Sequence, residues 1–139
     1  MRLFRRLFLG AALLGFLGIA GCQFEHNIDV KQKWTLKPNG IAWYNNDSGF
    51  NQKRRVKVTL QAFPSGTSVA VGVVLKDDFE ASKDAMKKGG EPPKYFASHA
   101  GGDNIQFEEF VIDAHTPFTV IAINRSDETV EAELKVKSR

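Results

Sequence analysis

The chain has 139 residues, 19 of them basic and 16 acidic, which gives a formal net charge of +3 at pH 7. Three of the basic residues (Arg2, Arg5 and Arg6) lie in the first 21 residues, which contain no acidic residue, so the other 118 residues carry 16 of each sign. Balanced charge provides no field to collect nucleic acid, which argues against that class of partner. The 118 residues have the size of one domain, and a single cysteine excludes an internal disulfide.

The first 21 residues have the pattern of an export signal. The three arginines are followed by Leu7–Ile19, which is apolar throughout. This stretch is shorter than the roughly 20 residues that span a bilayer core, and it has the length of a signal-peptide apolar region. Arg5 to Leu9 also resembles the twin-arginine export motif, so both the general secretory and the twin-arginine routes stay open. We expect residues 1–21 to be removed.

The signal ends in Ile19-Ala20-Gly21-Cys22, a branched apolar residue and two small residues before the cysteine. This sequence resembles the lipobox of bacterial lipoproteins. The resemblance implies cleavage before Cys22 by the lipoprotein signal peptidase, with Cys22 as the lipid attachment site. Two or more acyl chains anchor a protein stably, whereas one anchors it only marginally. In a host with two membranes, Gln23 after the cysteine would favour the outer membrane.

Alternation of apolar and polar residues predicts strands through the rest of the chain. We expect residues 22–27 to be the lipidated N-terminus and tether, and residues 28–139 to form one domain. A helix should follow Asp77 and Asp78 and end at Gly89-Gly90. The expected strands cover residues 24–36 (the early part belonging to the tether), 41–45, 55–63, 68–75, 95–98, 105–112, 118–123 and 129–136.

The predicted fold is therefore an all-β antiparallel sandwich of six to eight short strands with one short helix. Gly72, inside an apolar strand, indicates a bulge or a close approach of another segment. Asn124–Glu128 has the composition of a hairpin turn. The last third of the chain, with Thr116-Pro117-Phe118-Thr119-Val120, resembles the closing hairpin of jelly-roll-like accessory domains of secreted bacterial proteins. That resemblance implies a fold and no activity.

The sequence contains no pattern typical of an enzyme. There is no Gly-x-Ser-x-Gly turn, and lipid would occupy the only thiol. The adjacent carboxylates of Asp77-Asp78 and Glu108-Glu109 would point to opposite faces of an extended chain. The three histidines do not have the spacing of a metal site: they are His26, His99 and His115. We expect no catalysis, no metal and no cofactor.

Aromatic and basic residues between positions 41 and 55 are the candidate partner contacts, because loops carry binding residues more often than strands do. Phe50 lies among Ser48, Gly49, Asn51 and Gln52, with no apolar sequence neighbour, so we expect it to be exposed; a core position is the alternative. The candidates are Trp43, Tyr44, Phe50, Arg54 and Arg55. Tyr95 and Phe96 are further aromatics at a strand end.

The basic run Lys53–Lys57 has two interpretations. It is either the solvated start of a strand or a contact for anionic head groups or an acidic polymer near the membrane. Together these observations predict a lipid-anchored binding or interaction module of the cell envelope, facing the periplasm or the exterior. Its partner would be another envelope protein or a polysaccharide. A structural envelope lipoprotein without a small ligand is the alternative, and an envelope enzyme is the least favoured class.

Replacing Cys22 tests the anchor. In Cys22→Ser the hydroxyl oxygen is not a substrate for diacylglyceryl transfer, so we expect an unlipidated and unprocessed precursor. Metabolic labelling with a radioactive fatty acid measures this directly. Equal labelling of the wild-type protein and of Cys22→Ser would contradict the lipoprotein assignment.

Overall fold

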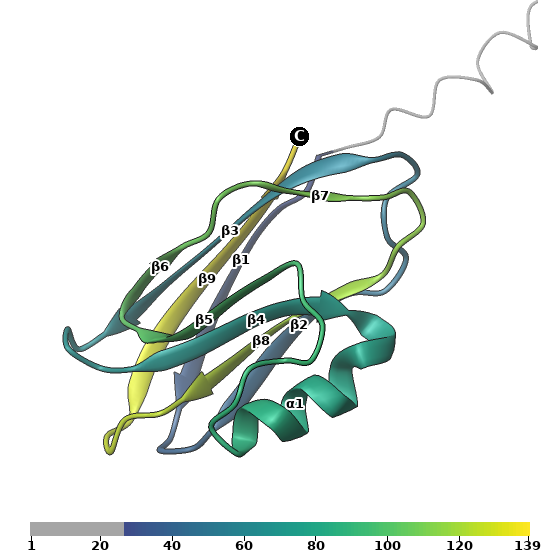
Figure 1. Ribbon diagram of the computed structural model, residues 1–139. Coiled ribbons are helices and arrows are strands. Elements are labelled where there is room, and N and C mark those ends of the chain that lie inside the picture. The colour runs from purple at the N-terminus through teal and green to yellow at the C-terminus, as the bar shows by residue number, and fades with distance from the viewer. Residues whose placement is uncertain (1–26) are drawn as a thin grey trace, which may run out of the picture.

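A computed structural model describes residues 27–139, which form two antiparallel sheets packed face to face (Figure 1). The expected signal peptide, Cys22 and the tether up to residue 26 lie outside the described residues. None of the helices in the described part is long and apolar enough to cross a membrane. The elements are β1 (Asp29–Leu36), β2 (Ile41–Asn46), β3 (Arg54–Phe63), β4 (Val69–Leu75), the 3-10 turn η1 (Lys76–Asp78), α1 (Phe79–Lys87), β5 (Ala97–Gly102), β6 (Asn104–Gln106), β7 (Phe110–Ile112), β8 (Phe118–Asn124) and β9 (Val130–Ser138).

The strand order confirms the all-β antiparallel sandwich. Sheet A has the order β1-β9-β3-β6, with β7 also paired to β3, and sheet B has the order β2-β8-β4-β5. The chain passes repeatedly from one sheet to the other, which is the order of a jelly roll if β6 and β7 together count as one edge strand. All of the strand pairs are antiparallel.

The described chain has nine strands rather than six to eight, mainly because the predicted strand 105–112 is interrupted. Gln106 is opposite Thr59, and Phe110 is opposite Val56. Three residues on the edge therefore face two residues of β3, which is the arrangement of a bulge. Phe107 turns into the core at this bulge, and its N–H donates to the carbonyl of Val58 at 3.2 Å.

The turn at Asn124–Glu128 joins two different sheets, so the prediction of a hairpin was wrong. β8 lies in sheet B and β9 in sheet A. The buried side-chain amide of Asn124 donates to the carbonyl of Leu36 at 2.9 Å and to that of Glu128 at 2.7 Å. These bonds connect the end of β8 in sheet B to the end of β1 in sheet A and to the turn that leads into β9. The composition of these residues predicts a turn, and the chain does turn here. Composition does not reveal which sheet the next strand joins.

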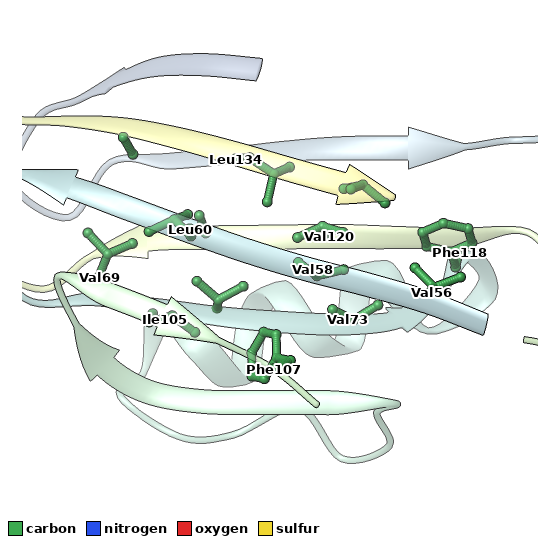
Figure 2. Close-up of a cluster of buried hydrophobic side chains, with 14 of the residues drawn as sticks. Val56, Val58, Leu60, Val69, Val73, Ile105, Phe107, Phe118, Val120 and Leu134 are labelled. Atoms are coloured by element: carbon green, nitrogen blue, oxygen red, sulfur yellow. The ribbon is translucent and has the colours of Figure 1, made fainter. Parts of the chain in front are cut away.

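The core lies between the sheets and follows the predicted alternation of β3. Val56, Val58, Leu60 and Ala62 are buried, and they face β4 and β8 of sheet B (Figure 2). β8 is buried along its whole length because both faces of sheet B are covered. The second cover is α1, which lies across the outer face of sheet B (Figure 1).

Gly72 of β4 lets α1 and the following segment approach the sheet, as the sequence predicted. A Cβ atom at Gly72 would lie 2.9 Å from Pro92 Cγ and 3.2 Å from Met86 Sδ. Both distances are below ordinary van der Waals contact. Met86 packs there with Ala70, Val74, Ile121 and Ile123 in a second apolar cluster. A glycine at this position therefore sets the distance between helix and sheet.

Gly72→Val should lower the free energy of unfolding by about 1–3 kcal/mol, because the added methyl groups overpack a closed interface. Gln61→Val adds a branched side chain at an exposed position of β3, and it should change stability by less than about 0.5 kcal/mol. Urea unfolding of both variants measures the difference. Equal stabilities would show that α1 is not packed against Gly72.

Candidate functional site

One end of the sandwich, which we call the proximal end, is where the described chain begins. The N–H of Ile28 donates to Ser138 Oγ at 2.8 Å, and the N–H of Ser138 donates to the carbonyl of Ile28 at 3.0 Å. Arg55 and Arg139 exchange backbone hydrogen bonds of 3.1 and 3.0 Å beside them. The start of β1, the end of β9 and the start of β3 therefore lie side by side (Figure 1).

Trp43 and Tyr44 point to opposite faces of β2, so they do not form one contact surface. The Trp43 side chain is 47% exposed on the outer face of sheet B, and its ring centroid lies 5.2 Å from that of Phe79. Tyr44 faces inward and meets Phe118 edge-on at 6.5 Å. Burial, and secondarily the charge of Asp47, raise the pKa of the Tyr44 phenol. Only Trp43 is open to a partner over much of its ring.

Phe50 is a core residue, and the expectation that it is exposed was wrong. Its side chain is 7% exposed, and its ring centroid lies 6.0 Å from that of Phe118. Its carbonyl accepts a hydrogen bond of 2.6 Å from the N–H of His115. A Cβ atom at Gly49 would lie 2.6 Å from the Thr116 nitrogen, so the two loops are closely packed. Phe50 finds its apolar neighbours in space rather than in sequence.

Arg54 and Arg55 begin β3 at the proximal end. Lys53, Arg54, Arg55 and Arg139 line a shallow hollow together with Val111, an exposed apolar residue. Arg139 Nη2 lies 2.8 Å from Glu109 Oε2, and Lys53 Nζ lies 3.6 Å from Asp113 Oδ1. The structure thus brings the two predicted arginines together with two further cations. Arg54 and Arg55 belong to sheet A, whereas Trp43 lies on the outer face of sheet B.

A small cleft lies at the same end, on the sheet B side. Its volume is about 290 Å³, and its apolar wall consists of Leu75, Tyr95 and Phe96. The backbone N–H of Phe96 donates to the carbonyl of Val73 at 2.8 Å, which holds this segment beside β4. Phe96 is stacked on Phe110 with centroids 5.7 Å apart, whereas the Tyr95 side chain is 50% exposed.

The polar part of the cleft comes from Asp78, Lys94, Asp113 and Thr116. Asp78 precedes α1, and Asp113 and Thr116 belong to the turn between β7 and β8. The cleft therefore combines an exposed aromatic ring with carboxylates, an ammonium and a hydroxyl. The sequence singled out Tyr95 and Phe96, which are preceded by Lys94. It could not indicate that the fold brings four more lining residues to them from two other segments: Leu75, Asp78, Asp113 and Thr116.

The described residues contain no group of three histidine, cysteine or carboxylate side chains placed to hold a metal ion. His99 Nδ1 accepts a hydrogen bond of 3.2 Å from the N–H of Gly101, within β5. His115 occupies a turn with a positive φ of 56°. These two histidines therefore lie in separate parts of the chain, one bonded to a nearby backbone N–H and the other in a turn.

Comparison with known proteins gives the class of the fold. No protein-family model matches the chain, and no curated protein matches it either. The Yersinia pseudotuberculosis-derived mitogen is similar, with a TM-score of 0.56 and 12% identity over 81% of this chain and 86% of that one. The pre-peptidase C-terminal domain of collagenase from Bacillus anthracis is also similar, with a TM-score of 0.57 and 13% identity over 79% and 90%.

A third structure, the periplasmic inhibitor of g-type lysozyme from Aeromonas hydrophila, aligns with a TM-score of 0.42 and 14% identity over 84% of this chain and 89% of that one. The other two likenesses show that this chain has the fold of small bacterial β-sandwich domains. At such low identities they establish the fold alone.

Phe50→Ala should lower the free energy of unfolding by about 3–5 kcal/mol, because it leaves a cavity against Phe118. Asn51→Ala, at the exposed neighbouring position of the same loop, should change stability by less than about 0.5 kcal/mol. Guanidinium unfolding curves of the two variants make the comparison. An unchanged unfolding midpoint for Phe50→Ala would contradict the core position of this residue.

Proposed function

We propose that this protein is a lipid-anchored binding module of the cell envelope and that the cleft beside Tyr95 is its ligand site. The observation that carries the proposal is the half-exposed Tyr95 ring, which lines the cleft together with Leu75 and several hydrogen-bonding side chains. Ligand sites generally combine an apolar wall with a few polar groups that fix orientation. The export signal and the lipobox at Cys22 support the location and the anchor.

The chemistry of the cleft suits a segment of polysaccharide. A sugar ring has an apolar face that can stack on the Tyr95 ring and Leu75. Its hydroxyls could donate to the carboxylates of Asp78 and Asp113, and they could exchange hydrogen bonds with Thr116. A volume of about 290 Å³ accommodates one ring and leaves the rest of a chain in solvent. Short contacts of this kind give modest affinity for a repeating polymer.

We assign the site no catalytic role. The lining of the cleft contains no histidine, serine or cysteine, and we assign its two carboxylates, Asp78 and Asp113, to hydrogen bonding of the ligand. The Asp113 carboxylate lies 3.6 Å from Lys53 Nζ and is exposed, so it is open to a hydrogen-bond donor of a ligand. Trp43 stays a proposed partner contact on the outer face of sheet B, and Arg54 and Arg55 stay proposed contacts at the start of β3. Tyr44 and Phe50 face the core and are no longer among them.

Tyr95→Ala tests the proposed site against a matched control. Phe63→Ala removes an aromatic ring with the same exposed fraction, 50%, from the outer face of sheet A. The probe is insoluble peptidoglycan, and the measurement is co-sedimentation. We expect Tyr95→Ala to weaken binding about tenfold, which corresponds to about 1.4 kcal/mol, and Phe63→Ala to leave it unchanged. Both variants should keep the wild-type melting temperature.

Equal binding by the wild-type protein and Tyr95→Ala would show that the cleft is not the site. If the wild-type protein fails to sediment with peptidoglycan, the polysaccharide proposal is contradicted and the structural alternative is favoured. Fatty-acid labelling of Cys22 tests the anchor independently of either result.

A further inference from the structure

We propose that the outer face of sheet A docks, at its proximal half, on the anionic phospholipid head groups of the membrane that holds the anchor. The inference rests on the proposed lipid attachment at Cys22 and goes beyond the ligand cleft. Its basis is a cationic face, which we define by Lys31, Arg55, Lys57, Lys135, Lys137 and Arg139.

The register of sheet A brings these six cations to one surface. Lys137 is paired with Asp29 on one side and with Lys57 on the other, and Lys135 is paired with Lys31 and Thr59. Residues paired across neighbouring strands point to the same face of a sheet. Because Val56, Val58, Leu134 and Val136 point into the core, the alternate residues of β3 and β9 point outward. Arg55 and Arg139 extend the outward rows at the proximal end.

Neighbouring carboxylates neutralise only part of this charge. Lys31 and Lys135 share Glu133, with Nζ to Oε1 distances of 3.5 and 3.6 Å. Lys137 Nζ lies 3.9 Å from Asp29 Oδ2, and Arg139 is paired with Glu109. Lys57 donates to the carbonyl of Phe107, which carries no charge. Six cations therefore face three carboxylates within these contacts.

The charge also has a direction along the sheet. Toward the distal end, the outward positions of the same three strands hold Lys33, Thr35, Gln61, Phe63, Glu131 and Glu133. That half carries one cation, Lys33, and one further carboxylate, Glu131, besides Glu133, which is already counted with Lys31 and Lys135. The excess of positive charge is thus confined to the half that lies beside the start of the described chain. The total charge of the domain is nearly balanced, but its positive charge is concentrated at the proximal end, which is the end nearest to the proposed anchor.

The length of the tether brings that half of the sheet within reach of the head groups. Cys22 and Asn27, the first described residue, are five residues apart, so the chain between them spans at most about 18 Å. At physiological ionic strength, interactions between exposed charges are screened over about 8 Å. Cations at the proximal end would therefore interact with an anionic membrane surface, whereas charges at the distal end would be too far from it. Anionic lipids attract clustered lysine and arginine side chains near the bilayer.

The test uses the full-length lipidated protein in vesicles of phosphatidylcholine, alone or with an equal part of phosphatidylglycerol. A fluorophore is attached at Gln106→Cys, exposed on sheet A opposite Thr59, or at Ala81→Cys, exposed on α1. Spin-labelled head groups quench a fluorophore that lies at the bilayer surface. We expect stronger quenching at position 106 than at position 81 in the anionic vesicles only, and loss of the difference at high salt.

A triple variant, Lys31→Gln with Lys135→Gln and Lys137→Gln, removes half of the cationic face. Each cation near an anionic surface contributes roughly a fivefold factor, so the docking equilibrium should weaken by roughly a hundredfold. The control changes Lys37, Lys87 and Lys88 to Gln, since Lys87 and Lys88 line a hollow with Asn39 at the distal end. The control should retain the wild-type quenching pattern.

Equal quenching at positions 106 and 81 in anionic vesicles would overturn the docking proposal, as would the same difference in neutral vesicles. Flotation with neutral vesicles reports the anchor separately, because a lipidated chain floats with both compositions. If the protein floats with both kinds of vesicle but shows no difference in quenching, the lipid anchor is supported and the docking proposal is contradicted.

Discussion

The position of β9 between β1 and β3 is the constraint on which the rest of the molecule depends. Its eight-residue registers with both neighbours fix which residues face the core and which face solvent. A shift of one residue would turn Leu134 and Val136 outward and bring lysines into the core, so burial enforces the register. The same pairing closes the proximal end, where the backbone N–H of Ser138 donates to the carbonyl of Ile28. The start of the domain and its cationic face are therefore consequences of one set of backbone hydrogen bonds.

The two sheets differ in what covers them, and this difference distributes the functional surfaces. Sheet B is covered inside by the core and outside by α1, so its central strands are apolar on both faces. Sheet A has a polar outer face, open to solvent. The cleft beside Tyr95 forms where the cover of sheet B ends, between the start of α1 and the turn before β8. Both proposed surfaces thus lie at the proximal end, on opposite sides of the sandwich.

Local patterns predicted the fold class, but contacts distant in sequence decided the site. The alternation in β3 and the close approach at Gly72 depend on nearby residues or on a missing side chain, which a sequence displays directly. The burial of Phe50 depends on Phe118, and the interruption at Phe107 depends on the register with β3. The turn at Asn124 had the right composition, yet only the topology shows that it joins two sheets. The basic run was visible in the sequence, whereas its lysine neighbours became apparent only when β1, β3 and β9 were paired.

The most direct test of a membrane-facing proximal end is lysine footprinting of the unmodified, lipidated chain in vesicles of phosphatidylcholine with or without phosphatidylglycerol. These lipids contain no reactive amine, so a water-soluble acetylating reagent reports the accessibility of protein lysines. The account predicts slower acetylation of Lys31, Lys135 and Lys137 in anionic than in neutral vesicles, and unchanged rates at Lys37, Lys87 and Lys88. Equal rates for the first group in both kinds of vesicle, or slowing confined to the second group, would contradict it.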